Sequence, residues 1–151
     1  RRVLFRSTTL LVTYSIIQAR LGKTVLFLVG NQSMLDHTRL IIDTYNIEMC
    51  ENSIRKIKNK VSFKSGGNIL LRCELDKFFI GHGINIVIAD GLSHKFEYDE
   101  NINYIIFSGA DKIILSTDQP RGFNDIKLMK YGFSIVEESD LVIRSFLRQR
   151  S

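Results

Sequence analysis

One segment, residues 83–90, constrains the fold of this chain more than any other. It reads Gly-Ile-Asn-Ile-Val-Ile-Ala-Asp, and Gly91 follows its terminal acidic residue, Asp90. A nearly continuous apolar run with β-branched side chains predicts a parallel strand buried on both faces. Ligands of open α/β sheets bind beyond the carboxyl ends of the strands, so Asp90 is a candidate ligand for a metal ion. An Asp that only caps the next turn is the alternative.

The length and composition are those of one globular domain. The chain has 151 residues, of which 44% are hydrophobic and 25% are charged, and this is enough for a sizeable core. No apolar run approaches the roughly 20 residues that a membrane-spanning helix needs. Cys50 and Cys73 have no metal-ligand spacing and suit the reduced thiols of a cytoplasmic protein. We therefore expect a single domain without a membrane segment.

The first seven residues affect how the charge is interpreted. The net charge is +5, but three arginines lie within residues 1–7. This segment resembles the translation of a sequencing-library adapter and has no initiator Met, so we interpret it as a non-native leader. Without it the net charge is +2, which says little about partners. We expect one domain over residues 8–151, incomplete at its N-terminus.

Helical and strand patterns alternate along the chain, as in βα units with a parallel sheet. Ser33 is a candidate N-cap. The turn residues 65–67, Ser-Gly-Gly, predict a β-hairpin, which we expect to form an edge insertion together with the basic segment 51–60. The predicted helices are residues 8–20, 33–45, 123–131 and 140–150, and the predicted strands are residues 24–29, 83–90, 112–117 and 133–136.

Two segments have features of phosphate-binding loops. Residues 21–24, Leu-Gly-Lys-Thr, imitate the end of such a loop, but Ile17 stands where the motif requires Gly. The predicted order is also helix then strand, so we reject this match. Thr8 and Thr9 stand at a predicted helix start, where the hydroxyl of a phosphate-binding motif reaches magnesium. An ordinary Thr N-cap is the alternative interpretation.

The order of these features resembles the ATPase domain of the large terminase subunit, the motor that packages viral DNA, and more loosely resembles helicases. The resemblance covers most of the chain from Thr8 to about Tyr131. The order of elements carries it more than any single motif. These elements are Thr8-Thr9 at a helix start, the segment 22–29, the hairpin 61–69, the strand ending at Asp90, the strand 112–117 and Gly122.

The resemblance implies an α/β fold of the P-loop NTPase type, a three-layer sandwich with a mainly parallel sheet. By this resemblance Asp90 holds Mg²⁺, Thr8 or Thr9 completes the ATP site, and Ser116 and Thr117 sense the γ-phosphate and couple it to movement. It further implies double-stranded DNA as a partner, a homo-oligomeric ring, a viral portal, no membrane, and the host cytoplasm as the location.

The chain departs from the family pattern in two places. Family members follow the Asp with a Glu that polarises the attacking water, whereas this chain has Gly91, and loss of that carboxylate lowers hydrolysis by orders of magnitude. The phosphate-binding loop ahead of Thr8 is also not visible. Glu97, Asp99 or Glu100 could replace the Glu only if the loop after Asp90 folds back; otherwise they are solvated.

DNA contacts are expected from two polar segments, because amide and Lys side chains position a phosphate backbone without reading sequence. Alternatively, the first segment caps a helix and the lysines keep an edge hairpin soluble. The candidate residues are Asn31, Gln32 and Ser33 in the first segment and Lys58, Lys60 and Lys64 in the second.

Three functions remain open from the sequence. The leading hypothesis is a fragment of a terminase-like motor ATPase that binds Mg-ATP and double-stranded DNA. A helicase-type translocase is the enzymatic alternative. The third is a non-catalytic, degenerate ATPase fold that acts as a nucleic-acid-binding or assembly module, and Gly91 favours it.

Overall fold

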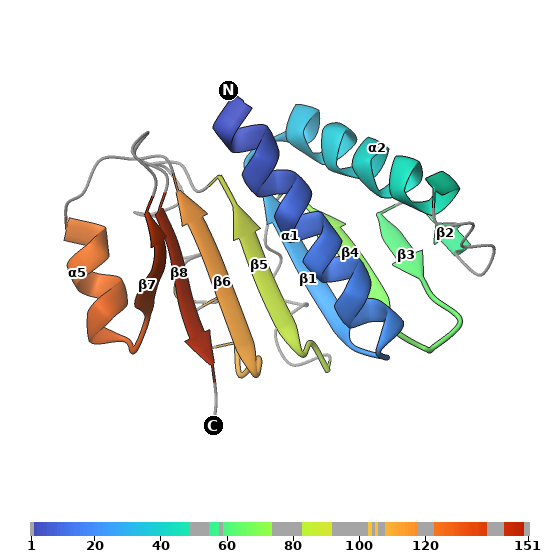
Figure 1. The fold of residues 1–151 in the computed structure, drawn as a ribbon. Helices are drawn as coiled ribbons and strands as arrows, with labels where there is room; N and C mark the ends of the chain where they lie inside the picture. The colour runs from blue at the N-terminus through green and yellow to red at the C-terminus, as the bar shows by residue number, and fades with distance from the viewer. Residues whose placement is uncertain are drawn as a thin grey trace.

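The computed structural model describes residues 2–48, 55–57, 59–73, 83–91, 103, 105, 108–117, 123–138 and 144–149. Within these ranges the chain forms an eight-stranded mixed sheet with helices packed against it (Figure 1). The helices are α1 (Arg2–Arg20), α2 (Gln32–Glu48) and α5 (Phe123–Lys130). The strands are β1 (Thr24–Val29), β2 (Arg55–Ile57), β3 (Lys60–Ser62), β4 (Asn68–Arg72), β5 (Ile86–Asp90), β6 (Lys112–Thr117), β7 (Ser134–Glu138) and β8 (Arg144–Gln149).

Parallel strands form the centre of the sheet in the order β4-β1-β5-β6. Antiparallel strands extend it on both sides, β3 and β2 next to β4, and β8 and β7 next to β6. The predicted α/β class is confirmed. The sheet, which was predicted to be mainly parallel, is mixed, and only its central strands are parallel. The layers are compatible with a three-layer sandwich, in which the sheet separates helices on its two faces.

Each face of the central strands has its own hydrophobic core. On one face, α1 and α2 lie across the sheet (Figure 1), and Val25, Phe27 and Val29 of β1 belong to the core beneath them. On the other face, Leu26 and Leu28 pack in a second core that includes a side chain from α5. Because both faces are covered, β1 and β5 are apolar at nearly every position, as the sequence predicted.

The hairpin is confirmed, but β4 is not part of an edge insertion as predicted. β3 and β4 pair antiparallel, and in their turn the Gly66 N–H donates to the Phe63 carbonyl at 3.0 Å. Gly66 has a φ of 90°, a left-handed conformation that favours glycine. β4 then pairs in parallel with β1, so only β3 and β2 extend this edge of the sheet.

The predicted closing helix over residues 140–150 is wrong where the chain is described, because residues 144–149 form β8. β8 pairs with β6 on one side and with β7 on the other, and Phe146 is fully buried. Two ladders of backbone hydrogen bonds and a buried aromatic ring outweigh local helical pattern. Arg148 therefore does not cap a helix, and its guanidinium lies 5.0 Å from the centre of the Phe133 ring.

The starts of both N-terminal helices also differ from prediction. α1 begins at Arg2 rather than at Thr8, because residues 2–7 contain neither Gly nor Pro and continue the helix. Thr8 therefore lies within the helix and is not its N-cap. α2 begins after Asn31, whose side-chain oxygen accepts a hydrogen bond from the Met34 N–H at 2.9 Å. Asn31 is thus the N-cap, and the predicted cap, Ser33, lies in the first turn.

Candidate functional site

Thr8 and Asp90 meet at the carboxyl edge of the parallel strands. The Thr8 hydroxyl donates a hydrogen bond to Asp90 Oδ2 at 2.6 Å, although the two residues are 82 positions apart in the chain. Both side chains are buried, with 3% of Thr8 and 2% of Asp90 exposed. Helix α1 lies over β1, and its N-terminal half comes near the carboxyl end of β5 (Figure 1). The fold therefore joins two of the residues that the sequence proposed for one site.

Ser116 lies beside Asp90 on the neighbouring strand. Ala89 and Leu115 are paired in the parallel register of β5 and β6, so Asp90 and Ser116, one residue later, are neighbours at a strand spacing of roughly 5 Å. Both lie on the α1 face, because side chains two positions apart in a strand share a face and Ile114 packs against the core beneath α1. Only 1% of Ser116 is exposed.

Two buried oxygens at this edge have no hydrogen-bond partner among the described residues. They are Asp90 Oδ1 and Ser116 Oγ. Leaving a buried polar atom unpaired costs roughly 1–3 kcal/mol, and more for a charged group. Most native structures avoid such atoms, so a pair on adjacent strands makes this edge a candidate binding site.

The ionisation of Asp90 is perturbed in the direction expected of such a site. Burial raises the pKa of the Asp90 carboxyl above its usual range, and the hydrogen bond from Thr8 and the nearby charge of His37 act in the opposite direction. The net shift is upward, so the folded protein holds its carboxylate at an energetic cost. A bound cation would offset this cost, because it favours the ionised form.

Gly91 has a backbone conformation that explains the departure from the family pattern. Its φ is 70°, in the left-handed region that other residues rarely adopt. A Cβ at this position would also lie 3.1 Å from the Cε of Met34. A Glu at position 91 would therefore be strained in this fold. Glu97, Asp99 and Glu100, the possible substitutes, lie outside the described residues.

Thr9 and Thr117 do not share the position of Thr8 and Ser116. Thr9 is exposed on the surface of α1. Thr117 is buried, with 3% exposed, but it follows Ser116 in the strand and therefore points to the opposite face. Of each predicted pair, the structure brings one member to Asp90.

The residues expected to contact DNA do not form one surface. Asn31, Gln32 and Ser33 are exposed after the carboxyl end of β1, near the Asp90 edge. Gln32 donates a hydrogen bond to Asp36 at 3.0 Å. Lys64 is exposed in the β3–β4 turn, which lies at the opposite edge because β4 begins there beside the start of β1. Lys60 is exposed at the start of β3, and Lys58 lies outside the described residues.

Two residues near the site were missed by sequence reasoning. His37 of α2 acts electrostatically on Asp90, and Ser145 of β8 pairs directly opposite Ser116. His37 is two positions from Leu35 in an amphipathic helix, and nothing in that pattern identifies a partner on β5. Ser145 was assigned to a helix, so its register with β6 was not foreseen.

The described residues around Asp90 suit Mg²⁺ better than a metal ion that takes all of its ligands from the protein. The oxygens of Asp90, Ser116 and Thr8 are hard donors of the kind that Mg²⁺ prefers. The described part of the chain contains no cluster of three or more His, Cys, Asp or Glu side chains suited to a metal. Magnesium is commonly held by one or two carboxylates together with substrate phosphates and water, which matches a single carboxylate here.

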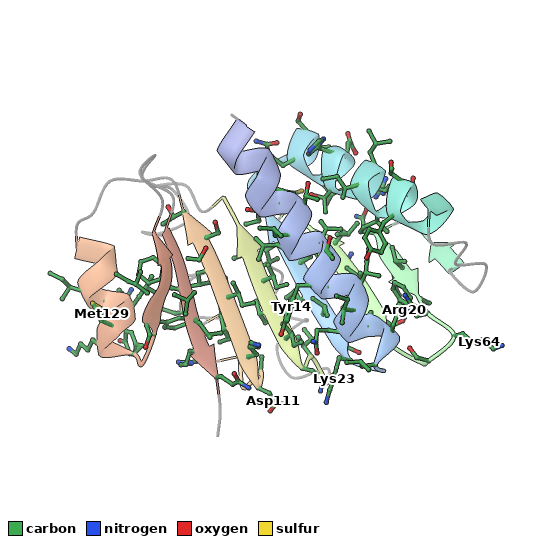
Figure 2. All side chains as sticks on the ribbon, in the orientation of Figure 1. Tyr14, Arg20, Lys23, Lys64, Asp111 and Met129 are labelled. Carbon is green, nitrogen blue, oxygen red and sulfur yellow. The ribbon has the colours of Figure 1, made fainter. Side chains whose placement is uncertain are left out.

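A polar pocket opens at the amino edge of the sheet, far from Asp90 along the strands. Within it, the Lys112 ammonium lies 4.9 Å from the centre of the Tyr14 ring. None of the residues that the sequence proposed for a site contributes to its lining. Figure 2 labels three of the lining residues, Tyr14, Lys23 and Asp111. The full lining is Tyr14, Gln18, Lys23, Asn85, Ile86, Asp111, Lys112 and Gln149.

No family model, curated protein or solved structure matches this chain. Among the helices of the described ranges, none has the length and apolar character needed to cross a bilayer.

Proposed function

We propose that this chain is the magnesium- and nucleotide-binding core of a terminase-like motor ATPase of the P-loop type. The observation that carries the proposal is the contact between the Thr8 hydroxyl and Asp90 Oδ2, which leaves Asp90 Oδ1 buried and unpartnered among the described residues. A helix hydroxyl and a strand-end carboxylate are the two side chains that hold Mg²⁺ in P-loop ATPases.

In this proposal each residue has a separate task. Asp90 supplies the negative charge for the ion, and Thr8 orients that carboxylate through its hydrogen bond. Ser116 places a hydroxyl on the adjacent strand, where it responds to the presence of a ligand phosphate. When bound, Mg²⁺ neutralises phosphate charge and orients the phosphoryl group.

For this chain we propose nucleotide binding without hydrolysis. Residues 2–7 are helical, and therefore do not form the phosphate-binding loop that hydrolysis requires ahead of Thr8. Hydrolysis and DNA translocation are proposed for a protein in which such a loop precedes Thr8. A second motor domain in that protein would favour the helicase-type alternative, and a nuclease domain rich in Asp would favour the terminase.

A non-catalytic nucleic-acid-binding module is the second candidate. The observation that favours it is the left-handed backbone of Gly91, with a φ of 70°, which disfavours the Glu that would polarise water. In that case the Asp90 site binds nucleotide weakly or not at all, and the fold serves as a scaffold.

Thermal unfolding with ligands tests the proposal. The unfolding temperature is measured with Mg²⁺ alone, with ADP or ATP alone, and with each nucleotide plus Mg²⁺. We expect the nucleotide with Mg²⁺ to raise it, since a ligand at a hundred times its Kd adds about 2.7 kcal/mol. Phosphate release is measured in parallel, and we expect none from this chain.

Two variants make the test specific. Asp90→Asn should lose the response to Mg²⁺ with nucleotide, measured against its own ligand-free baseline. Asp111→Asn is the matched control, because Asp111 is exposed at the opposite edge of the sheet, and it should respond as the wild type does. Equal responses of wild type and Asp90→Asn would contradict the site. A wild type that ignores every nucleotide but binds DNA would favour the second candidate.

A further inference from the structure

Two segments of this chain contain basic residues but no acidic residue. Residues 8–35 and 52–73 carry eight Lys or Arg and no Asp or Glu. The first segment includes most of α1 and all of β1, and the second includes β2, β3 and β4. Apart from the three arginines of residues 1–7, the excess positive charge of the chain therefore lies in these two segments. Whether they form one surface depends on the tertiary structure.

A hydrogen bond joins the two segments at the C-terminal end of α1. The Ser65 hydroxyl in the β3–β4 turn donates to the Ala19 carbonyl at 2.7 Å. Helix carbonyls in the last turn lack partners within the helix, so this contact docks the turn onto the helix end. The Asn68 N–H also donates to the Lys23 carbonyl at 3.1 Å, which fixes the turn to the start of β1.

The fit between the turn and the helix is close. Gly67 is buried, and a Cβ added to it would lie only 1.8 Å from the Ala19 carbonyl oxygen. Any side chain at this position would force the turn away from α1. The hydrogen bond from Ser65 therefore fixes the turn on the helix, and Gly67 allows the close approach because it has no side chain.

This docking gathers cations from three elements at one end of the molecule. Arg20 ends α1, Lys23 precedes β1 and Lys64 lies in the hairpin turn, and all three are exposed. Figure 2 shows them around the same end of α1, opposite the end marked N in Figure 1. We name Arg20, Lys23 and Lys64 the hairpin surface. It lies at the amino edge of the sheet, away from Asp90.

We infer that the hairpin surface binds the phosphate backbone of double-stranded DNA. Three cations on a rigid support can each neutralise a phosphate and release its counterions. The residues from Leu21 to Gly22 and from Ser65 to Gly66 include no aromatic side chain. Tyr14 shares a pocket with Lys23, but the Lys112 ammonium lies over its ring, 4.9 Å from the centre. Single-stranded nucleic acid is bound largely by stacking bases on aromatic rings, so a duplex, which presents only its backbone, fits this surface better.

The inference deepens the DNA-binding part of the proposed function and changes which residues carry it. It adds Arg20 and Lys23 to Lys64, and it leaves out Asn31, Gln32 and Ser33 because they lie at the other edge. It rests on the proposed function for the choice of DNA, but the surface needs neither Mg²⁺ nor nucleotide. The two proposals can therefore fail separately.

Fluorescence anisotropy with a labelled DNA duplex of about two helical turns tests the inference, in a titration over salt concentration without nucleotide. The test variant is Lys23→Gln with Lys64→Gln. The matched control is Lys127→Gln with Lys130→Gln, which removes the same charge from the last turn of α5. Asp90→Asn is measured beside them to separate this surface from the magnesium site.

We expect the test variant to bind about tenfold more weakly at low salt and to lower the slope of log K against log salt by about two, since each phosphate contact contributes about 0.9. The α5 control and Asp90→Asn should bind as the wild type does. Ser65→Ala, which keeps every charge, should bind several-fold more weakly because it loosens the turn.

Three results would overturn the inference. Equal losses for the test variant and the α5 control would show that only total charge matters. Tighter binding of a single-stranded oligonucleotide than of the duplex would contradict the choice of duplex. If the wild type did not bind DNA, the inference would be wrong, and an acidic protein would be the better candidate partner for this surface. If Asp90→Asn loses its nucleotide response while binding DNA normally, both proposals are supported independently.

Discussion

A side-chain hydroxyl makes a hydrogen bond at each end of helix α1, but the surroundings of the two contacts differ. Near its N-terminal half, the Thr8 hydroxyl binds a buried carboxylate on β5, and that carboxylate keeps an oxygen without a partner among the described residues. At its C-terminal end, the Ser65 hydroxyl binds the Ala19 carbonyl, and the cations around it are exposed to solvent.

The Asp90 site has a buried oxygen without a partner among the described residues, whereas the contact of the β3–β4 turn with the end of α1 is made by paired groups. A buried charge with an unpaired oxygen costs free energy until something binds. Where the β3–β4 turn meets α1, the Ser65 hydroxyl is paired with the Ala19 carbonyl. This contact therefore contributes to stability and to the position of the nearby charges. An unpaired buried oxygen at the carboxyl edge is typical of a binding site, whereas the paired polar groups at the amino edge hold exposed cations in place.

The largest change in the free energy of unfolding is expected where the β3–β4 turn packs against α1. Gly67→Ala should lower the free energy of unfolding by about 3 kcal/mol, because the new Cβ overlaps a backbone oxygen that cannot move without shifting α1. Gly66→Ala is the control: it has a φ of 90° and open space around it, so only backbone strain of about 1 kcal/mol is expected. Urea denaturation measures both. Equal losses would mean that the turn does not depend on close contact with α1.

The contact between Thr8 and Asp90 should give the next largest effect. Thr8→Val keeps the shape of the side chain but removes the donor to Asp90 Oδ2, and should cost about 2 kcal/mol. Thr9→Val, one position along on the exposed face of α1, should change stability by less than about 0.5 kcal/mol. The same denaturation experiment compares them. Similar values for the two variants would show that the bond to Asp90 contributes little.

A smaller loss of stability is expected from a substitution at Gly91, and it tests whether this turn can accept a Glu. Gly91→Glu should destabilise the fold by about 1–2 kcal/mol, since it places a side chain in the left-handed region. We expect no phosphate release from this variant. A variant that is as stable as the wild type would show that this turn can accept the Glu of the family pattern.

The smallest change is expected from Asp90→Asn, which keeps an acceptor for Thr8. Burial raises the pKa of the folded Asp90 above its ordinary value of 3.8, so the folded state holds its proton to higher pH than the unfolded state. The free energy of unfolding therefore falls as pH rises through the interval between the two pKa values.

Without ligand, Asp90→Asn should consequently be more stable than the wild type at neutral pH. The advantage should disappear as the pH falls below about 3.8. Thermal unfolding across this pH range measures the difference. A variant that is less stable than the wild type at neutral pH would show that the carboxylate, despite its burial, stabilises the fold.

Local sequence determined the central strands and the position of Asp90. The apolar runs 25–29, 86–89 and 113–115 favour burial on both faces of a sheet, so their identity as strands could be predicted without knowing their neighbours. The acidic residue that ends such a run has to emerge at the carboxyl edge. For the same reason the candidate site could be placed at that edge.

Only the tertiary structure decided what each of these strands meets. Residues 144–149 became β8 because the edge of β6 was open to pairing. The contact between Thr8 and Asp90 required the N-terminal half of α1 to pack next to the end of β5. The docking of Ser65 on Ala19 likewise joined charges that are distant in the chain. Burial periodicity is local and can be read along a sequence, whereas contacts between residues 46 or 82 positions apart are decided by the packing of the whole fold.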